Sequence, residues 1–193
     1  MPRIEIVPYD KRWPEEFATI AKALRETFGY IAVRIDHIGS TSVPGLAAKD
    51  VIDLQLTVRE IDRELFAPHA AAAGFSVDPE LRNDHVPPGE SNDDPAEWTK
   101  AWLHPARPMR RNHVHVRQAG RANQRYPLLF RDYLRANPGA AESYRLIKVA
   151  LARLHPDDMD AYYDVKDPVC DLIIDSAERW AKDTSWTLGP SDA

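Results

Sequence analysis

The feature that most constrains this chain is a change in its hydrophobic pattern near residue 120. Before that point, apolar residues alternate or cluster in the short segments 31–38, 51–58, 98–103 and 112–117, which is typical of strands. Beyond it, apolar residues recur at helical spacing over 121–136, 138–154 and 157–183. The sequence therefore predicts an α+β fold, with a small mixed β-sheet flanked by helices and a helical C-terminal half.

The length and composition of the chain predict a single domain. Its 193 residues are 44% hydrophobic, which is enough for one compact core. We expect that domain to cover residues 1–183 and residues 184–193 to form a flexible tail. Asp167 followed by Pro168 resembles a helix cap and first turn, so the stretch 157–183 is expected as either one helix or two.

Charge and cysteine content limit the partners and the compartment that we expect. The formal net charge is −5, so no general positive field would attract nucleic acid, and we expect no nucleic-acid partner. Cys170 is the one cysteine, the N-terminal residues lack a signal-peptide pattern, and no apolar run reaches the roughly 20 residues needed to cross a bilayer. These features predict a cytoplasmic protein without a membrane partner.

A hydroxyl-rich turn followed by a strand is the first candidate site. Glycine in such a turn lets backbone N–H groups approach a phosphate, and neighbouring hydroxyls add donors. On the following strand, Asp53 and Gln55 share the face opposite the apolar residues, so a metal at Asp53 could adjoin a phosphate at the turn. A turn without any ligand is the alternative. The candidate phosphate-binding residues of the turn are Gly39, Ser40 and Thr41.

The segment HVHVR predicts a second polar face on a later strand. Val114 and Val116 are expected in the core, which leaves His113 and His115 together on the other side. Imidazole suits Zn²⁺, Mn²⁺ or Fe²⁺ better than Mg²⁺, so these residues could complete a metal site with Asp53. Alternatively, the histidines hydrogen-bond carboxylates or a phosphate. His37, next to the turn, is expected to support the same cluster or to orient the turn.

Several segments, in the same order along the chain, resemble the GrpB family of nucleotidyltransferase-like proteins. They are HIGSTSVPGLAAK followed by DVIDLQL, KAWLHPARPMRRNHVHVR, LLFRDYLRANPGAAESYRLIKVALA and YYDVKDP. The resemblance implies a Gly-Ser turn and an Asp-x-Asp/Glu pair that hold a nucleotide and two Mg²⁺ ions. Gly39, Ser40 and Asp53 match that pattern, whereas Gln55 stands where a second acid is expected. Gln55 is therefore a candidate metal ligand that contributes no charge.

Two tyrosine-lysine pairs in the helical half supply candidate cations. Tyr144 and Lys148 are four residues apart on one predicted helix, as are Tyr162 and Lys166 on another. In the nucleotidyltransferase scheme that the resemblance implies, such lysines hold the phosphates, with the tyrosines supporting them. As solvated helix lysines they would need no ligand.

Three functions follow from these residues. The first is a nucleotidyltransferase that binds a nucleoside triphosphate, ATP foremost, with Mg²⁺ or Mn²⁺ and transfers a nucleoside monophosphate to a small-molecule or protein acceptor. In it Asp53 and Gln55 are catalytic and hold the metal, with His115 as a possible further ligand. The second is a catalytically degenerate module that binds a nucleotide or another phosphorylated small molecule. The third is a transition-metal-dependent hydrolase built on the histidine face.

Overall fold

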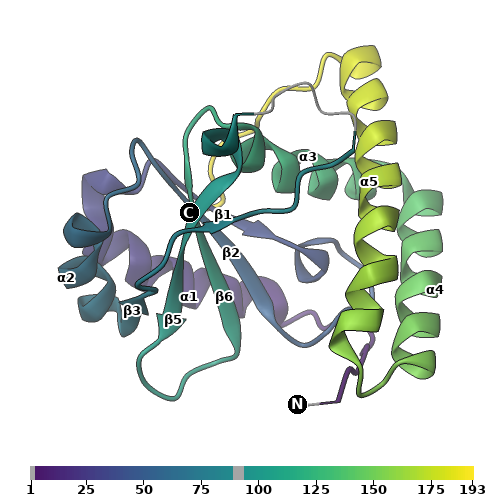
Figure 1. Cartoon of the computed structure of the whole chain (residues 1–193), viewed down its shortest axis with the longest axis horizontal. Helices are drawn as coiled ribbons and strands as arrows, with labels where there is room; N and C mark the ends of the chain where they lie inside the picture. Colours follow the sequence, from purple (N-terminus) through teal and green to yellow (C-terminus); the bar gives the residue numbers. More distant parts are fainter. Residues whose placement is uncertain (1–2, 89–93) are drawn as a thin grey trace.

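The computed structural model describes residues 3–88 and 94–193, and these residues form a mixed β-sheet with helices packed against it (Figure 1). The strands are β1 (Arg34–Ile38), β2 (Ile52–Val58), β3 (Phe75–Val77), β4 (Arg82–Asn83), β5 (Thr99–Pro105) and β6 (Asn112–Gln118). The helices are α1 (Trp13–Phe28), α2 (Arg63–Ala73), α3 (Ala122–Ala136), α4 (Pro138–Leu154) and α5 (Met159–Thr184). The predicted fold class is confirmed. None of the helices in the described ranges has both the length and the apolar character that a bilayer span requires.

The strand order β1-β2-β6-β5-β3 puts the two motif-bearing strands side by side at the centre of the sheet, and β4 pairs with β5. β2 and β6 are parallel, and their register sets Asp53 opposite His113 and Gln55 opposite His115. Because side chains alternate along a strand, all four residues leave the sheet on the same side. Strand pairing therefore brings together two polar patterns that are about 60 residues apart in the sequence.

The opposite face of the sheet carries the main hydrophobic core. Leu54 and Leu56 of β2 and Val114 of β6 are fully buried there, against Leu24 of α1 and Phe66 of α2. Burying one such side chain contributes roughly 1.5–3 kcal/mol, so this face fixes which way β2 and β6 are turned. The polar face is consequently directed toward the helical half.

Helix α5 is continuous through Pro168, so the alternative of two separate helices is not adopted. Proline removes one helical hydrogen bond, but its fixed φ is compatible with a helix. Apolar contacts hold the helix on both sides of the proline. Before it, Tyr162 packs against Leu151 and Ile4. After it, Ile174 packs against residues of α3.

The last residues of the chain, predicted as part of a flexible tail, lie along β1 in the structure. Ser191 Oγ accepts a hydrogen bond from the backbone N–H of Ile35 at 2.9 Å, and the N–H of Ala193 donates to the Ile35 carbonyl at 3.1 Å. The Asp192 carboxylate accepts from the N–H of His37 at 2.9 Å and from Arg131 at 2.7 Å. β1 ends the strand order and its outer backbone groups need partners, which this segment supplies.

Candidate functional site

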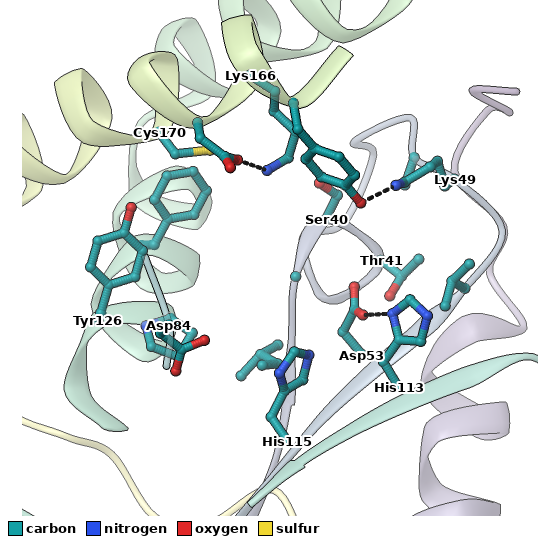
Figure 2. Close-up of a pocket in the computed structure, with 18 of the residues that line it drawn as sticks. Ser40, Thr41, Lys49, Asp53, Asp84, His113, His115, Tyr126, Lys166 and Cys170 are labelled. Carbon is teal, nitrogen blue, oxygen red and sulfur yellow. Dashed lines mark hydrogen bonds and ion pairs between the residues drawn. The ribbon is translucent and has the colours of Figure 1, made fainter. Parts of the chain in front are cut away.

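A cavity of about 440 Å³ lies between the polar face of the sheet and helices α3, α4 and α5 (Figure 2). It brings together most of the candidate residues that the sequence predicted. Lining it are Gly39, Ser40, Thr41, Asp53, His113, His115, Tyr144, Lys148, Tyr162 and Lys166. Two predicted site residues, His37 and Gln55, do not line it.

The turn and Asp53 form one compact unit. Gly39 has φ 69° and ψ −175°, a conformation that is essentially restricted to glycine, and it leads into the short 3-10 turn Ser40–Ser42. A Cβ atom built on Gly39 would overlap the Asp53 carboxylate and lie 3.0 Å from the Asp53 Cβ. The turn therefore needs glycine both for its backbone conformation and for its close approach to Asp53.

His37 lies behind the turn rather than in the cavity. Its ring stacks on Phe17 with centroids 4.7 Å apart, and its Nε2 lies 3.0 Å from Thr41 Oγ1. Burial lowers the pKa of His37 to about 4, although Asp53 and Asp192 favour the charged form. The neutral ring orients the turn through Thr41, which was the alternative role considered for it, and it is not part of the histidine face.

Gln55 is committed to protein contacts, so its predicted role as a metal ligand needs correction. The side chain is fully buried, its Nε2 donates to the Gln124 carbonyl at 2.9 Å, and its Oε1 accepts from Arg117 at 2.8 Å. The oxygen that was expected to face a metal thus faces a guanidinium, whose charge repels a cation. Of the two β2 residues that were expected to hold a metal, only Asp53 therefore lines the cavity.

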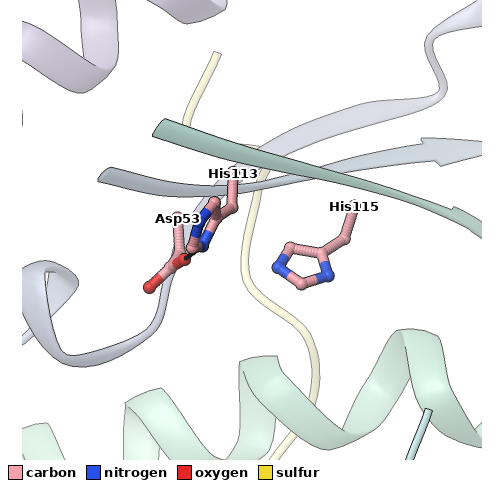
Figure 3. A group of neighbouring side chains, drawn as sticks. All are labelled: Asp53, His113 and His115. Carbon is pink, nitrogen blue, oxygen red and sulfur yellow. Dashed lines mark hydrogen bonds and ion pairs between the residues drawn. The ribbon is translucent and has the colours of Figure 1, made fainter. Parts of the chain in front are cut away.

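Asp53, His113 and His115 offer three ligand atoms that all lie within 4.8 Å of one another (Figure 3). His113 Nδ1 is 3.1 Å from Asp53 Oδ1. The pKa of His115 is lowered well below its ordinary value, first by burial and then by the charges of Arg117 and Lys100. A neutral imidazole is the form that binds a metal, and two imidazoles with one carboxylate suit Mn²⁺, Fe²⁺ or Zn²⁺ better than Mg²⁺.

The lysines that line the cavity differ in whether a carboxylate pairs with them. Lys166 pairs with Asp167 at 3.0 Å. Lys148 is 2% exposed, and its Nζ donates to Ser40 Oγ at 2.9 Å and to the Ala47 carbonyl at 2.6 Å. Lys49 donates to the Tyr163 hydroxyl at 2.7 Å. Within the described ranges, neither Lys49 nor Lys148 has a carboxylate within ion-pair distance, and we call these two residues the unpaired lysines.

The surroundings of Lys148 lower the pKa of its ammonium group. Burial, followed by the positive charge of Lys166, lowers the pKa of Lys148 to about 7. Its Nζ also lies 4.6 Å from the centroid of the Tyr144 ring, which partly stabilises the ammonium. A nearby anion would raise this pKa again and favour the charged form.

Sequence reasoning missed a buried polar cluster at the other side of the cavity, around Asp84. This residue belongs to the polar segment 83–97, which has no regular hydrophobic pattern, and residues 89–93 of that segment lie outside the described residues. Asp84 pairs with Lys100 at 2.5 Å and with Arg117 at 2.8 Å. Burial would raise the pKa of Asp84, but these two cations together hold it well below its ordinary value. The alternation of β5 could have indicated Lys100, whereas nothing local marks Asp84.

Trp102 of β5 lines the cavity and lies against both histidines. Its ring centroid is 4.3 Å from that of His115 and 5.2 Å from that of His113. The strand alternation around residues 98–103 could have placed it on the polar face. It limits the rotation of both imidazoles and so holds the histidine face in its orientation.

The fold and the cavity define an α+β protein with a predominantly cationic cleft between a mixed sheet and a helical half. Five lysine or arginine side chains and three carboxylates line the cleft. The chain belongs to the GrpB family: the family model described as "GrpB protein" matches residues 3–176. The resemblance inferred from the sequence motifs is thereby confirmed.

The relatives that match nearly all of this chain carry two different names. A protein named dephospho-CoA kinase from Mycolicibacterium paratuberculosis is 36% identical over 196 residues, covering 95% of this chain and 48% of that protein. UPF0157 protein YqkA from Bacillus subtilis is 34% identical over 181 residues, covering 93% of this chain and 49% of that protein. This chain therefore spans about half the length of these relatives.

A solved structure shares the fold. The crystal structure of conserved protein GrpB from Enterococcus faecalis superposes with a TM-score of 0.70 and 32% sequence identity, covering 91% of this chain and 99% of that one. This chain therefore shares its arrangement of sheet and helices with that GrpB protein.

Proposed function

We propose that the cavity binds a nucleoside triphosphate, ATP foremost, together with a divalent metal, and that the chain transfers a nucleoside monophosphate to a hydroxyl or amine acceptor. Membership in the GrpB family suggests a nucleotidyltransferase-like fold. The observation that carries the proposal is the convergence of the unpaired lysines with the Ser40 turn, next to Asp53, in one cavity. Lys148 is buried and Lys49 is half-buried, and cations in such places without carboxylate partners are suited to an anionic ligand.

The side chains around the turn would hold the phosphates. Lys148 already donates to Ser40 Oγ, so a phosphate oxygen at this position would receive hydrogen bonds from both groups. Lys49, held by the Tyr163 hydroxyl, adds a second charge from the other side of the turn. An ammonium gains more from a phosphate than from a neutral hydroxyl, because charge-assisted hydrogen bonds are roughly twice as strong as neutral ones.

The residues that would hold the metal are Asp53, His113 and His115. This donor set fits Mn²⁺ better than Mg²⁺, since it has one carboxylate where Mg²⁺ favours several oxygens. When bound, such an ion would neutralise charge on phosphate oxygens. The chain's own part is to hold the ligand atoms in place: Asp53 is fixed against Gly39, and the imidazoles are fixed against Trp102.

Binding is tested by calorimetry with ATP, with and without Mn²⁺ or Mg²⁺. Lys148→Met keeps the length of the side chain but removes its charge, and it should weaken binding about 10- to 150-fold, the equivalent of one charge-assisted hydrogen bond. Lys22→Met is the matched control, because Lys22 lies on α1 with its side chain 77% exposed, and it should bind ATP like the wild type. Equal affinities for the two variants would refute the proposed phosphate site.

Transfer is tested by pyrophosphate release from ATP in the presence of mixed hydroxyl and amine acceptors. Release should require Mn²⁺ or Mg²⁺ and should be lost in Asp53→Ala. ATP binding without metal and without any release would favour the second candidate function, a binding module without turnover. The contact between Gln55 and Arg117 is the observation that favours this second candidate, because it leaves the site one carboxylate short of an Asp-x-Asp/Glu pair.

The Asp53, His113 and His115 cluster also favours a third candidate, a transition-metal-dependent hydrolase. Elemental analysis of the purified protein separates it from the others. Stoichiometric Zn, lost in His113→Ala, in protein that releases no pyrophosphate from ATP would support it, and metal-free protein that still releases pyrophosphate on addition of Mg²⁺ would exclude it.

A further inference from the structure

A second compartment of about 170 Å³ adjoins the main cavity on the side away from the turn. The two spaces share lining residues that include Tyr126, Pro127 and Lys166. Figure 2 shows Tyr126 across the cavity from Thr41 and Asp53. We call this space the aromatic compartment. Trp98 and Asn123 line it and not the main cavity, whereas Tyr126 and Pro127 line both. A ligand with its charged end at the turn could extend its other end into it.

Flat apolar surfaces form one wall of the aromatic compartment. The Tyr126 ring is nearly parallel to the Phe130 ring, with an interplanar angle of 11° and centroids 6.2 Å apart. Trp98 meets Tyr126 edge to face at 6.4 Å. Burial raises the pKa of Tyr126, so its phenol stays neutral. These contacts fix the Tyr126 ring, and a fixed aromatic face is suited to stacking against a planar ring.

Two polar atoms in the walls of this compartment lack partners. Among the described residues, nothing accepts from the Trp98 indole N–H and nothing donates to Asn123 Oδ1. The two residues are 3% and 1% exposed, so bulk water does not satisfy these atoms either. Buried polar groups without partners are uncommon and destabilising. The compartment therefore has an aromatic face, and two of its lining residues carry an unpartnered polar atom that lies beneath its surface, which a ligand reaches only if these side chains shift.

We propose that the aromatic compartment holds the base of the nucleotide, stacked on Tyr126, while the phosphates lie at the Ser40 turn. This inference rests on the proposed function and specifies the chemical class at the far end of the ligand. A nucleobase is planar, so it matches the Tyr126 ring, and the acceptors and N–H donors on its edge would pair with the two unpartnered atoms once Trp98 and Asn123 shift toward it. A ligand made of phosphates alone would not reach this compartment, and a sugar at that end has no flat ring to stack on Tyr126.

The test compares ATP with inorganic tripolyphosphate, which has the phosphates but no base, by calorimetry on the full chain. Tyr126→Leu keeps apolar volume but removes the aromatic face, and Tyr126→Phe keeps the ring. Tyr126→Leu should weaken ATP binding about 5- to 150-fold, the range measured for losing one base–aromatic stack, and should change tripolyphosphate binding less than twofold. Tyr126→Phe should stay within about threefold of the wild type for both ligands.

A second variant tests the hydrogen bond from the Trp98 indole N–H to the base, independently of Tyr126. Trp98→Phe removes the indole N–H while retaining an aromatic side chain, and it should weaken ATP several-fold without changing tripolyphosphate binding. The inference is overturned if Tyr126→Leu and Trp98→Phe leave ATP binding unchanged or weaken both ligands equally. It is also overturned, with the proposed phosphate site intact, if wild-type protein binds tripolyphosphate as tightly as ATP. If neither ligand binds, the proposed function and this inference both fail.

Discussion

Replacing Gly39 with alanine would test the contact on which the candidate site is built. The φ and ψ of Gly39 lie in a region that costs other residues roughly 1–3 kcal/mol. The new Cβ would also overlap the Asp53 carboxylate, and forcing extra atoms into a packed site typically costs a further 1–3 kcal/mol. We therefore expect Gly39→Ala to lower the free energy of unfolding by about 4 kcal/mol, which corresponds to roughly 8–16 °C in Tm for a chain of this size.

Gly45→Ala is the matched control for this substitution. Gly45 has φ 82°, but a Cβ built there meets nothing within 4 Å, so only the backbone penalty of about 1–2 kcal/mol should remain. The free energy of unfolding is measured in urea for both variants and for the double variant Gly39→Ala with Asp53→Ala. The comparison separates the backbone strain at residue 39 from the overlap of its new Cβ with Asp53. The double variant should recover about 1–2 kcal/mol relative to additivity. If Gly39→Ala is no worse than Gly45→Ala, and the double variant is additive, the turn does not press against Asp53 and the reasoning is refuted.

Three further predictions concern charge. Burial lowers the pKa of Lys148 from its ordinary 10.5 to about 7, so the unfolded chain binds more protons between these pH values. The free energy of unfolding should therefore rise from pH 7 to 9 in denaturant titrations, and Lys148→Met should flatten this rise. Gln55→Glu should pair with Arg117 rather than with a metal, so calorimetry should find the Mn²⁺ affinity changed less than threefold; a tenfold gain would contradict the observed contact. Asp192→Ala should lower the free energy of unfolding by about 1–3 kcal/mol, because the side chain of Arg131 loses an acceptor, and an unchanged unfolding midpoint would show that the end of the chain does not bind β1.

Local sequence patterns predicted much of the fold because local physics decides it. The apolar spacing of α1 places Phe17 and Leu24 in the core, and Gly29 directly follows its last residue. The alternation in β2 separated Leu54 from Asp53 correctly, since successive side chains of any strand point to opposite faces. The break considered at Pro168 did not occur, because contacts with other helices on both sides of the proline outweigh a weak local preference.

The sequence by itself determined the inventory of the site: a glycine-serine turn, Asp53, the histidine pair and the tyrosine-lysine helices. Only the tertiary structure decided how these groups are used. The alternation of the strand showed that Gln55 shares a face with Asp53. The parallel pairing of β2 with β6 then brought Arg117, 62 residues away, to donate a hydrogen bond to the Gln55 side-chain oxygen. In the same way, Asp84 joined the site from a segment without any regular pattern. The direction of a side chain is set by its immediate neighbours along the chain, whereas its partner is set by strand pairing and helix packing between distant segments.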